Sequence, residues 1–398
     1  MIPKSVGQIE LGDLKALIGN AREGKTIEFK QQLPARSEQE KVQFLKTAAS
    51  FANTSGGDLI IGMTAEGGLA KQLTGLPLPE SDEYRLRLEQ ILASSLEPRL
   101  PRYEFKPIAC GDGLYALVMR VPRSWLGPHR VTNNNKFYGR NSAGSYELDV
   151  QELRSAFVQL DTIAERMRGF RIDRVAKIAA GDAPVTLLDG GILVLHVVPF
   201  STFDAGSAFA LDEAVREPDR FPPLLDSRAR QYQTTFDGLL TTSNLDAPPK
   251  PQRAYVQVMR SGAVEAVASS LAQGREGNIL ILPKLQAMII HYSRLYAAGL
   301  HALGAEPPMA ILGSLLGVQG MTLLQDFIPQ GAIPEDLPSA KLDRSQYSLV
   351  ETIFEALPLS DKDAAKRLKG TLDHLANAAG LASSPYFDAA GNYTANLD

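Results

Sequence analysis

An abrupt change of periodicity is the feature of this sequence that most constrains its fold. Over residues 38–52 apolar side chains such as Leu45 and Ala49 fall on one stripe, which is typical of an amphipathic helix. The Asn-Thr-Ser-Gly-Gly stretch at 53–57 breaks this pattern, because glycine accepts the backbone conformations of a tight turn. The apolar residues 59–63 follow between glycines and predict a buried strand. A helix that turns directly into a buried strand indicates a mixed α and β core.

Extended along the chain, the same patterns predict an α+β fold in two domains. We expect an N-terminal α/β domain at 1–150, a helical connector at 151–180, and a second mixed α/β domain at 181–398 with a helical tail at about 345–380. The helices and strands expected in the first domain lie at residues 11–19, 26–30, 38–52, 59–63, 80–96, 103–109, 114–121 and 136–140.

Composition and charge restrict the classes of function. The single cysteine, Cys110, excludes a disulfide framework and a cysteine-based zinc site. The N-terminus lacks a secretory signal and no apolar run is long enough to span a membrane, so we expect a cytoplasmic protein. The net charge of −4 divides into 25 Lys and Arg against 21 Asp and Glu over residues 1–177, and 16 against 24 over the remainder. The mildly basic front half leaves room for one anion-binding face.

Residues Gly19–Thr26 match the phosphate-loop pattern G-x-x-x-x-G-K-S/T. A true phosphate loop follows a strand and precedes a helix, whose N-terminal N–H groups then face the phosphates. Here the predicted order is helix, turn, strand. We therefore interpret the match as a turn and expect no ATP.

Two acids flank this turn. Glu23 and Glu28 lie five residues apart, one in the turn and one in the strand. Paired carboxylates can hold Mg²⁺ or Mn²⁺, and such ions activate water at a phosphodiester. The alternative, two ordinary surface acids, stays open at this spacing.

The stretch Glu23-Gly-Lys-Thr-Ile-Glu-Phe-Lys30 and the block Ser50–Gly62 together resemble the Schlafen-type AlbA domain. That family shows E-S-x-x-x-E-F-K and then A-F-A-N-T-x-G-G-x-L-x-I-G-V. The resemblance continues through Val121–Ser124 and Phe137–Gly144 and covers about residues 20–150. It implies nucleic-acid binding. In some members it implies metal-dependent cleavage of transfer RNA and related structured RNA, and in some prokaryotic relatives a role in phage defence.

The resemblance also implies which residues form the site. The family's nucleases use three carboxylates, and Glu23 and Glu28 match the first two, which would be the metal ligands. The third is an Asp in a G-V-D-D-like segment, where this chain has Gly-Met-Thr-Ala-Glu ending at Glu66. Glu66 would replace it only with a shifted loop. Lys30, beside the acids on the strand, would neutralise the scissile phosphate.

A basic segment without acids runs from Gly113 to Tyr146. Arginine and lysine neutralise phosphates, and interleaved aromatic rings can stack on unpaired bases. The alternative is an ordinary solvated loop. The residues expected to hold a nucleic-acid backbone are Arg120, Arg123, Arg130, Lys136 and Arg140.

Two functions follow from these observations. The first is an RNA-binding protein with possible Mg²⁺- or Mn²⁺-dependent endoribonuclease activity, in which two copies of the single domain build one cleft as a homodimer. The second is a non-catalytic DNA- or RNA-binding regulator or scaffold that self-associates through its C-terminal half. The sequence of residues 181–398 does not indicate a ligand.

Overall fold

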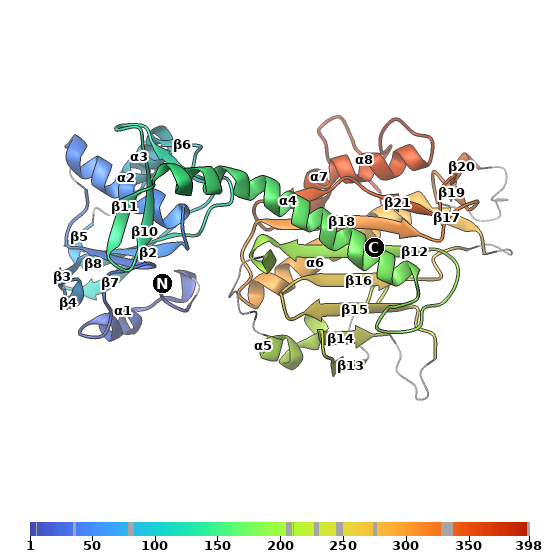
Figure 1. Cartoon of the computed structure of the whole chain (residues 1–398), viewed down its shortest axis with the longest axis horizontal. Helices are drawn as coiled ribbons and strands as arrows, with labels where there is room; N and C mark the ends of the chain where they lie inside the picture. Colours follow the sequence, from blue (N-terminus) through green and yellow to red (C-terminus); the bar gives the residue numbers. More distant parts are fainter. Residues whose placement is uncertain are drawn as a thin grey trace. The chain divides into compact units, whose positions relative to one another are not determined.

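The computed structural model describes residues 1–4, 6–34, 37–78, 83–203, 209, 211–226, 231–243, 250–273, 277–327 and 337–395, without the side chains of 159–161. The chain forms two compact units, Met1–Thr162 and Ile163–Asp398. The division falls inside the long helix α4 (Val150–Ala179). Helices and strands are mixed in both units, which confirms the α+β class (Figure 1).

A five-stranded sheet forms the centre of the first unit. Its strands β1 and β2 are parallel, with Phe29 opposite Ile60, and helix α2 (Glu38–Ala52) connects them. The other neighbours in the sheet are antiparallel. The strand order is β1 (Ile27–Lys30), β2 (Gly57–Ile61), β8 (Leu114–Val121) and β5 (Leu76–Pro77), and β7 (Glu104–Gly111) also pairs with β8.

Layers cover both faces of this sheet. One face packs on α2 and α3 (Glu83–Ser95), and the other packs beside α1 (Leu11–Leu17). A smaller sheet lies against α2, which contacts both β10 and β9. The smaller sheet contains β11 (Gly144–Glu147), β10 (Lys136–Asn141), β9 (Arg130–Val131) and β6 (Leu96–Glu97), and a separate hairpin contains β3 (Met63–Glu66) and β4 (Leu69–Leu73).

The turn between α2 and β2 explains the glycines of the sequence block. Gly56 has a φ of 70°, which side-chain-bearing residues rarely adopt. A Cβ on Gly57 would lie 2.2 Å from the Phe51 ring. Asn53 ends the helix, but its amide serves the next layer instead of the helix end: it donates to the carbonyls of His129 and Tyr138 and accepts from the His129 N–H.

The second unit is built on an eight-stranded antiparallel sheet. Helix α6 (Leu282–Ala302) packs on one face and Val175 and Ile178 of α4 pack on the other (Figure 1). The sheet strands are β13 (Gln231–Thr234), β14 (Gly238–Thr242), β15 (Ala254–Met259), β16 (Val264–Ala268), β12 (Ile192–Pro199), β18 (Met309–Leu316), β21 (Gln346–Ser348) and β22 (Thr352–Phe354).

The other short elements of this unit flank the main sheet. They are α5 (Leu211–Arg216), α7 (Asp361–Arg367), α8 (Lys369–Ala378) and a three-stranded sheet of β17 (Ile279–Ile281), β19 (Thr322–Leu324) and β20 (Ser339–Lys341).

A buried charged network joins α4 to the main sheet. Glu265 of β16 accepts two hydrogen bonds of 2.7 Å from Arg174 of α4. Tyr255 donates to the same carboxylate at 2.9 Å, and the Nε2 atom of His196 lies 3.0 Å from it. Burial alone raises the pKa of Glu265, but its partners outweigh burial and lower this pKa to about 2.

Two sequence predictions fare differently here. Gly19–Thr26 lies between α1 and β1, so the expected helix, turn and strand order is confirmed. The helical tail predicted at 345–380 is wrong over its first part, because β21 and β22 pair with β18 before α7 and α8 begin. The predicted start of the helix at 80–96 lies outside the described residues. Among the helices that the structure describes, none is long and apolar enough to cross a membrane.

Candidate nucleic-acid interface

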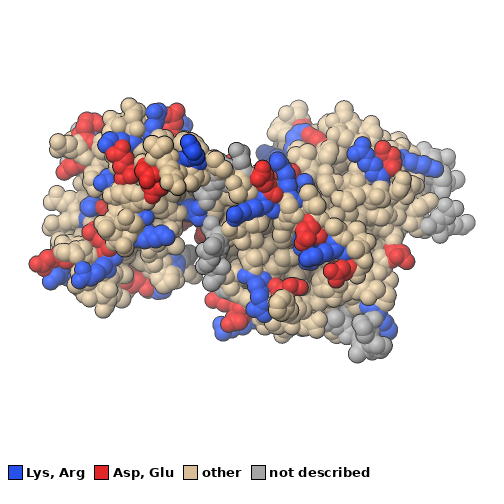
Figure 2. All heavy atoms as spheres, viewed as in Figure 1, with Lys and Arg blue, Asp and Glu red and all other residues tan. Residues whose placement is uncertain are grey.

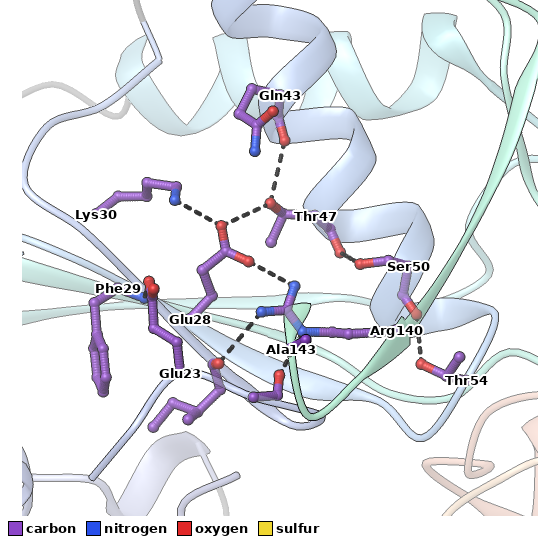
Figure 3. A network of polar contacts seen from close by, with 12 residues as sticks. Glu23, Glu28, Phe29, Lys30, Gln43, Thr47, Ser50, Thr54, Arg140 and Ala143 are labelled. Carbon is purple, nitrogen blue, oxygen red and sulfur yellow. Dashed lines mark hydrogen bonds and ion pairs between the residues drawn. The ribbon is translucent and has the colours of Figure 1, made fainter. Parts of the chain in front are cut away.

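Strand β1 places Glu28 and Lys30 on one face of the central sheet. Successive side chains of a strand point to opposite faces, so Ile27 and Phe29 enter the core beside α1 while Glu28 points toward α2 (Figure 3). There its Oε1 atom accepts from the Thr47 hydroxyl at 3.2 Å and lies 2.7 Å from the ammonium nitrogen of Lys30. The carboxylate is thus held between a strand lysine and a helix hydroxyl.

Arg140 of β10 binds the second oxygen of this carboxylate. Its Nη1 atom lies 2.5 Å from Oε2 of Glu28, and its side chain is 1% exposed. Its Nε donates to the Gly24 carbonyl at 2.6 Å and its Nη2 to the Ile27 carbonyl at 3.4 Å. The guanidinium also lies 4.5 Å from the centre of the Phe51 ring. Arg140 therefore connects the small sheet, the turn before β1 and α2.

These partners keep Glu28 ionised. Burial by itself raises the pKa of a carboxyl group, and it is the largest single influence on Glu28. The combined charges and hydrogen bonds of Lys30 and Arg140 nevertheless bring the pKa of Glu28 below its ordinary value. An ionised, buried carboxylate holds the Lys30 ammonium in place, while the Lys30 side chain stays 41% exposed.

Glu23 lies in the turn before β1 and is partly buried. Its Oε1 atom accepts from the backbone N–H of Phe29 at 3.0 Å. Its own N–H donates to the carbonyl of Gly68, in the loop that joins β3 and β4. Both acids are drawn in the same close-up (Figure 3). The carboxylate of Glu23 joins the turn to strand β1 through its hydrogen bond with Phe29.

Glu66 lies on the β3–β4 hairpin. Its carboxylate is 2.9 Å from the ammonium nitrogen of Lys71 and its side chain is 78% exposed. Within the described part of the chain, no group of three or more His, Cys, Asp and Glu side chains is placed to hold a metal ion. Both oxygens of Glu28 already contact cations. The described donor set therefore does not fit the three-carboxylate metal site that the resemblance implies.

A pocket of about 360 Å³ opens beside Lys30. It lies between residues 31–34, the first half of α2 and strand β2. Arg87 of α3 donates to the carbonyl of Pro34 at 2.8 Å and so steadies one wall. The pocket is lined by Lys30, Gln31, Gln32, Leu33, Pro34, Glu40, Gln43, Phe44, Thr47, Leu59 and Ile61.

Four cations of the acid-free segment contact acids that lie outside this segment. Where side chains can be compared, Arg130 is 36% and Lys136 is 46% exposed, whereas Arg120 is 14% exposed. Arg123 stacks 4.1 Å above the Trp125 ring. The pairs are Arg120 with Asp58, Arg130 with Glu97, Lys136 with Glu147, and Arg140 with Glu28.

This pairing separates two kinds of cation. On the face in Figure 2, Lys and Arg side chains lie among Asp and Glu side chains instead of in one uniform patch. Arg120 also donates to the carbonyls of Ile2 and Lys4 and so fixes the N-terminal segment. Arg120 and Arg140 thus hold the interior together, and Arg130 and Lys136 are the better exposed candidates for phosphate contacts.

The sequence interpretation missed Thr47, Gln43 and Arg87. Thr47 is a polar residue on the buried side of α2. A buried hydroxyl is a weak signal for a polar partner on the sheet that the helix packs against. Nothing in the spacing of Gln43 or Arg87 relates them to Lys30, because they reach the pocket only through the packing of α2 and α3 around residues 31–34.

Comparison with known proteins finds one family model that matches part of this unit. Residues 23–149 match the protein-family model described as Schlafen, AlbA_2. None of the curated proteins compared matches the chain.

Two solved structures are similar to part of the chain. One is the DIP2311 protein from Corynebacterium diphtheriae, with 16% identity and a TM-score of 0.26 over 36% of this chain; the chain covers only 27% of that protein. The other is the N-terminal domain of a RecG-related protein from Nitrosomonas europaea, with 26% identity and a TM-score of 0.23 over 29% of this chain and 74% of that one.

The family match agrees with the resemblance predicted from the Glu23–Lys30 and Ser50–Gly62 stretches. It supports a nucleic-acid-related function for the matched part of the chain. Residues 23–149 are therefore similar to the Schlafen, AlbA_2 family.

Proposed function

We propose that the domain at residues 23–149 binds the phosphate backbone of unpaired RNA beside Lys30. One observation carries this proposal: the Lys30 ammonium is anchored 2.7 Å from the buried Glu28 carboxylate, yet its side chain is 41% exposed at the edge of a pocket. An ammonium has three N–H donors, and the Glu28 contact uses one of them. A phosphate oxygen is the natural acceptor for the others.

Further cations offer contacts for the phosphates of a nucleic-acid strand that continues past Lys30. Arg87 reaches the pocket wall through the Pro34 carbonyl, and its planar guanidinium suits a phosphate. Arg130 and Lys136 are partly exposed on the small sheet. Each of these two cations is paired with one acid, so a bound phosphate would contact a cation that also contacts a carboxylate.

An unpaired strand is favoured over a duplex because a pocket of about 360 Å³ lies next to Lys30, and proteins recognise RNA mostly through unpaired loops whose bases are splayed out. The preference for RNA over DNA comes from the resemblance to the Schlafen-type AlbA domain. DNA binding is the alternative that the experiment below separates.

The same geometry favours binding without cleavage. Arg140 and Lys30 occupy both oxygens of Glu28, and Glu66 pairs with Lys71. This agrees with a non-catalytic regulator or scaffold. Metal-dependent cleavage, homodimer formation and a role in phage defence stay predictions of the resemblance.

The test is a titration of the full chain against fluorescently labelled transfer RNA, single-stranded RNA, single-stranded DNA and duplex DNA at about 50 mM salt, where ionic binding is strong. We expect the tightest binding to unpaired RNA. The same RNAs are then incubated with Mn²⁺, beside a Glu28→Gln control. Cleavage that the control lacks would establish the nuclease instead, and failure to bind any of the four would refute the proposal.

A further inference from the structure

The pocket beside Lys30 has two kinds of wall. Its floor is apolar and comes from Phe44 of α2 and from Leu59 and Ile61 of β2. Leu33 and Pro34 close one side. These apolar side chains offer van der Waals contact but no hydrogen bonds.

The rim of the pocket is polar. Gln31, Gln32 and Gln43 bring three amide groups to its edge, and each amide offers both donors and an acceptor. All three residues are exposed. Lys30 adds a positive charge at the same rim, and Glu40 adds an acid. The combination of an apolar slot with adaptable hydrogen-bonding groups around it is characteristic of small-ligand pockets, whose volumes begin at about 300 Å³.

We propose that this pocket receives one unstacked base of the bound nucleic acid, with the phosphate of that nucleotide on Lys30. The inference rests on the function proposed above and adds its recognition element. A base has an apolar face that suits the Phe44, Leu59 and Ile61 floor, and an edge of donors and acceptors that suits the glutamine rim. Its phosphate supplies the anion that Lys30 requires.

This ligand accounts for the lining better than a free anion does. Inorganic phosphate would use Lys30 and leave the apolar floor uncovered. An apolar ligand without polar groups would leave the amides unmatched. A double-stranded nucleic acid keeps its bases stacked, so only an unpaired or extruded base can enter such a pocket.

Two variants test the base contact separately from the phosphate contact. Gln43→Ala removes a rim amide at an exposed position, and Leu33→Ala removes part of a wall. Leu33 is half-buried and packs against the core, so the unfolding midpoint of each variant is measured beside its affinity. Gln39→Ala is the matched control, because Gln39 is an exposed residue of the same helix α2 outside the pocket lining. Affinity for a single-stranded RNA and for an RNA duplex of equal length is measured over a range of salt concentrations.

We expect the Gln43→Ala, Leu33→Ala double variant to bind the single-stranded RNA about fivefold or more weakly, since a base contact of this kind contributes at least about that factor. Its salt dependence should be unchanged because no charge is lost. Duplex binding and the Gln39→Ala control should equal wild type. A second measurement compares adenosine, guanosine, cytidine and uridine 5′-monophosphates with ribose 5-phosphate by saturation-transfer NMR, with the strongest transfer expected at base protons.

The outcomes separate the two proposals. Equal single-stranded binding by the double variant and Gln39→Ala would overturn the base pocket while leaving phosphate binding intact. Ribose 5-phosphate binding as well as the nucleotides would also overturn it, in favour of a simple anion site. If the wild-type protein binds none of these RNAs, the proposed function itself is refuted.

Discussion

Arg140 and Glu28 form an ion pair in the interior of the N-terminal unit, with 2.5 Å between Nη1 and Oε2. They lie on different sheets, one on β10 and one on β1. The pair therefore links the small sheet to the strand that presents Lys30. It also gives Arg140, a residue that the basic segment suggests as a phosphate contact, a structural partner.

Replacing Arg140 with Ala should destabilise the N-terminal unit strongly. The change leaves Glu28 with Lys30 alone among its cationic partners, and it removes the donors to the carbonyls of Gly24 and Ile27. Breaking a buried pair from one side costs about 3–5 kcal/mol of unfolding free energy. The single tryptophan, Trp125, is buried in this unit, so its fluorescence during urea unfolding reports this loss.

The control for that measurement is Arg85→Ala. Arg85 contacts Glu89 one turn along α3, on the surface, and such a pair contributes at most about 1 kcal/mol. If both variants shifted the unfolding midpoint equally, the buried pair would not hold the two sheets as described.

Gly57→Ala should also destabilise this unit, for a steric reason. Its new Cβ would lie 2.2 Å from an edge atom of the Phe51 ring, so the ring or the strand has to move. Overpacking of a core costs about 1–3 kcal/mol. Gly12→Ala is the comparison, because Gly12 of α1 has open space around it and alanine favours a helix. Differential scanning fluorimetry should show a lower Tm for the first variant and no decrease for the second.

The Glu265 network predicts an acid-dependent loss of stability in the second unit. The pKa of Glu265 is about 2 in the fold against an ordinary value of 4.5, so its contribution is complete above about pH 4.5 and is lost as the pH falls toward 2. Glu265→Gln removes that contribution. The difference in unfolding free energy between wild type and variant should therefore shrink by about 2 kcal/mol from about pH 7 to about pH 3.

Circular dichroism during urea unfolding measures this difference, and Trp125 fluorescence serves as the internal reference for the other unit. A difference that stays constant over the whole pH range would show that the charge of Glu265 does not stabilise the fold.

Local patterns were enough to predict the centre of the first unit. The helical stripe at 38–52, the glycine turn and the strand after it all correspond to α2, its turn and β2. The tail at 345–380 was harder, because β21 and β22 are only three residues long each and depend on pairing with β18. Hydrogen bonds between segments far apart in the sequence leave no periodic trace in such short strands.

The site was predictable only along strand β1. Alternate side chains of a strand share a face, so the spacing of Glu28 and Lys30 in the sequence already predicts that they lie on the same side of β1. The partners of the basic segment come from elsewhere: Asp58 binds Arg120, and Glu97 contacts Arg130. The segment 113–146 contains no acids, but acids from neighbouring strands contact its cations in the folded unit.

The central claim is that the Lys30 ammonium binds a phosphate, and the salt dependence of RNA binding by Lys30→Ala tests it most directly. Lys71→Ala is the matched control, because Lys71 is an exposed lysine paired with Glu66 outside the pocket. We predict that Lys30→Ala weakens binding and lowers the slope of log affinity against log salt by about 0.7, the loss of one phosphate contact on a single strand, while Lys71→Ala matches wild type. An unchanged slope in a folded Lys30→Ala protein would contradict the account.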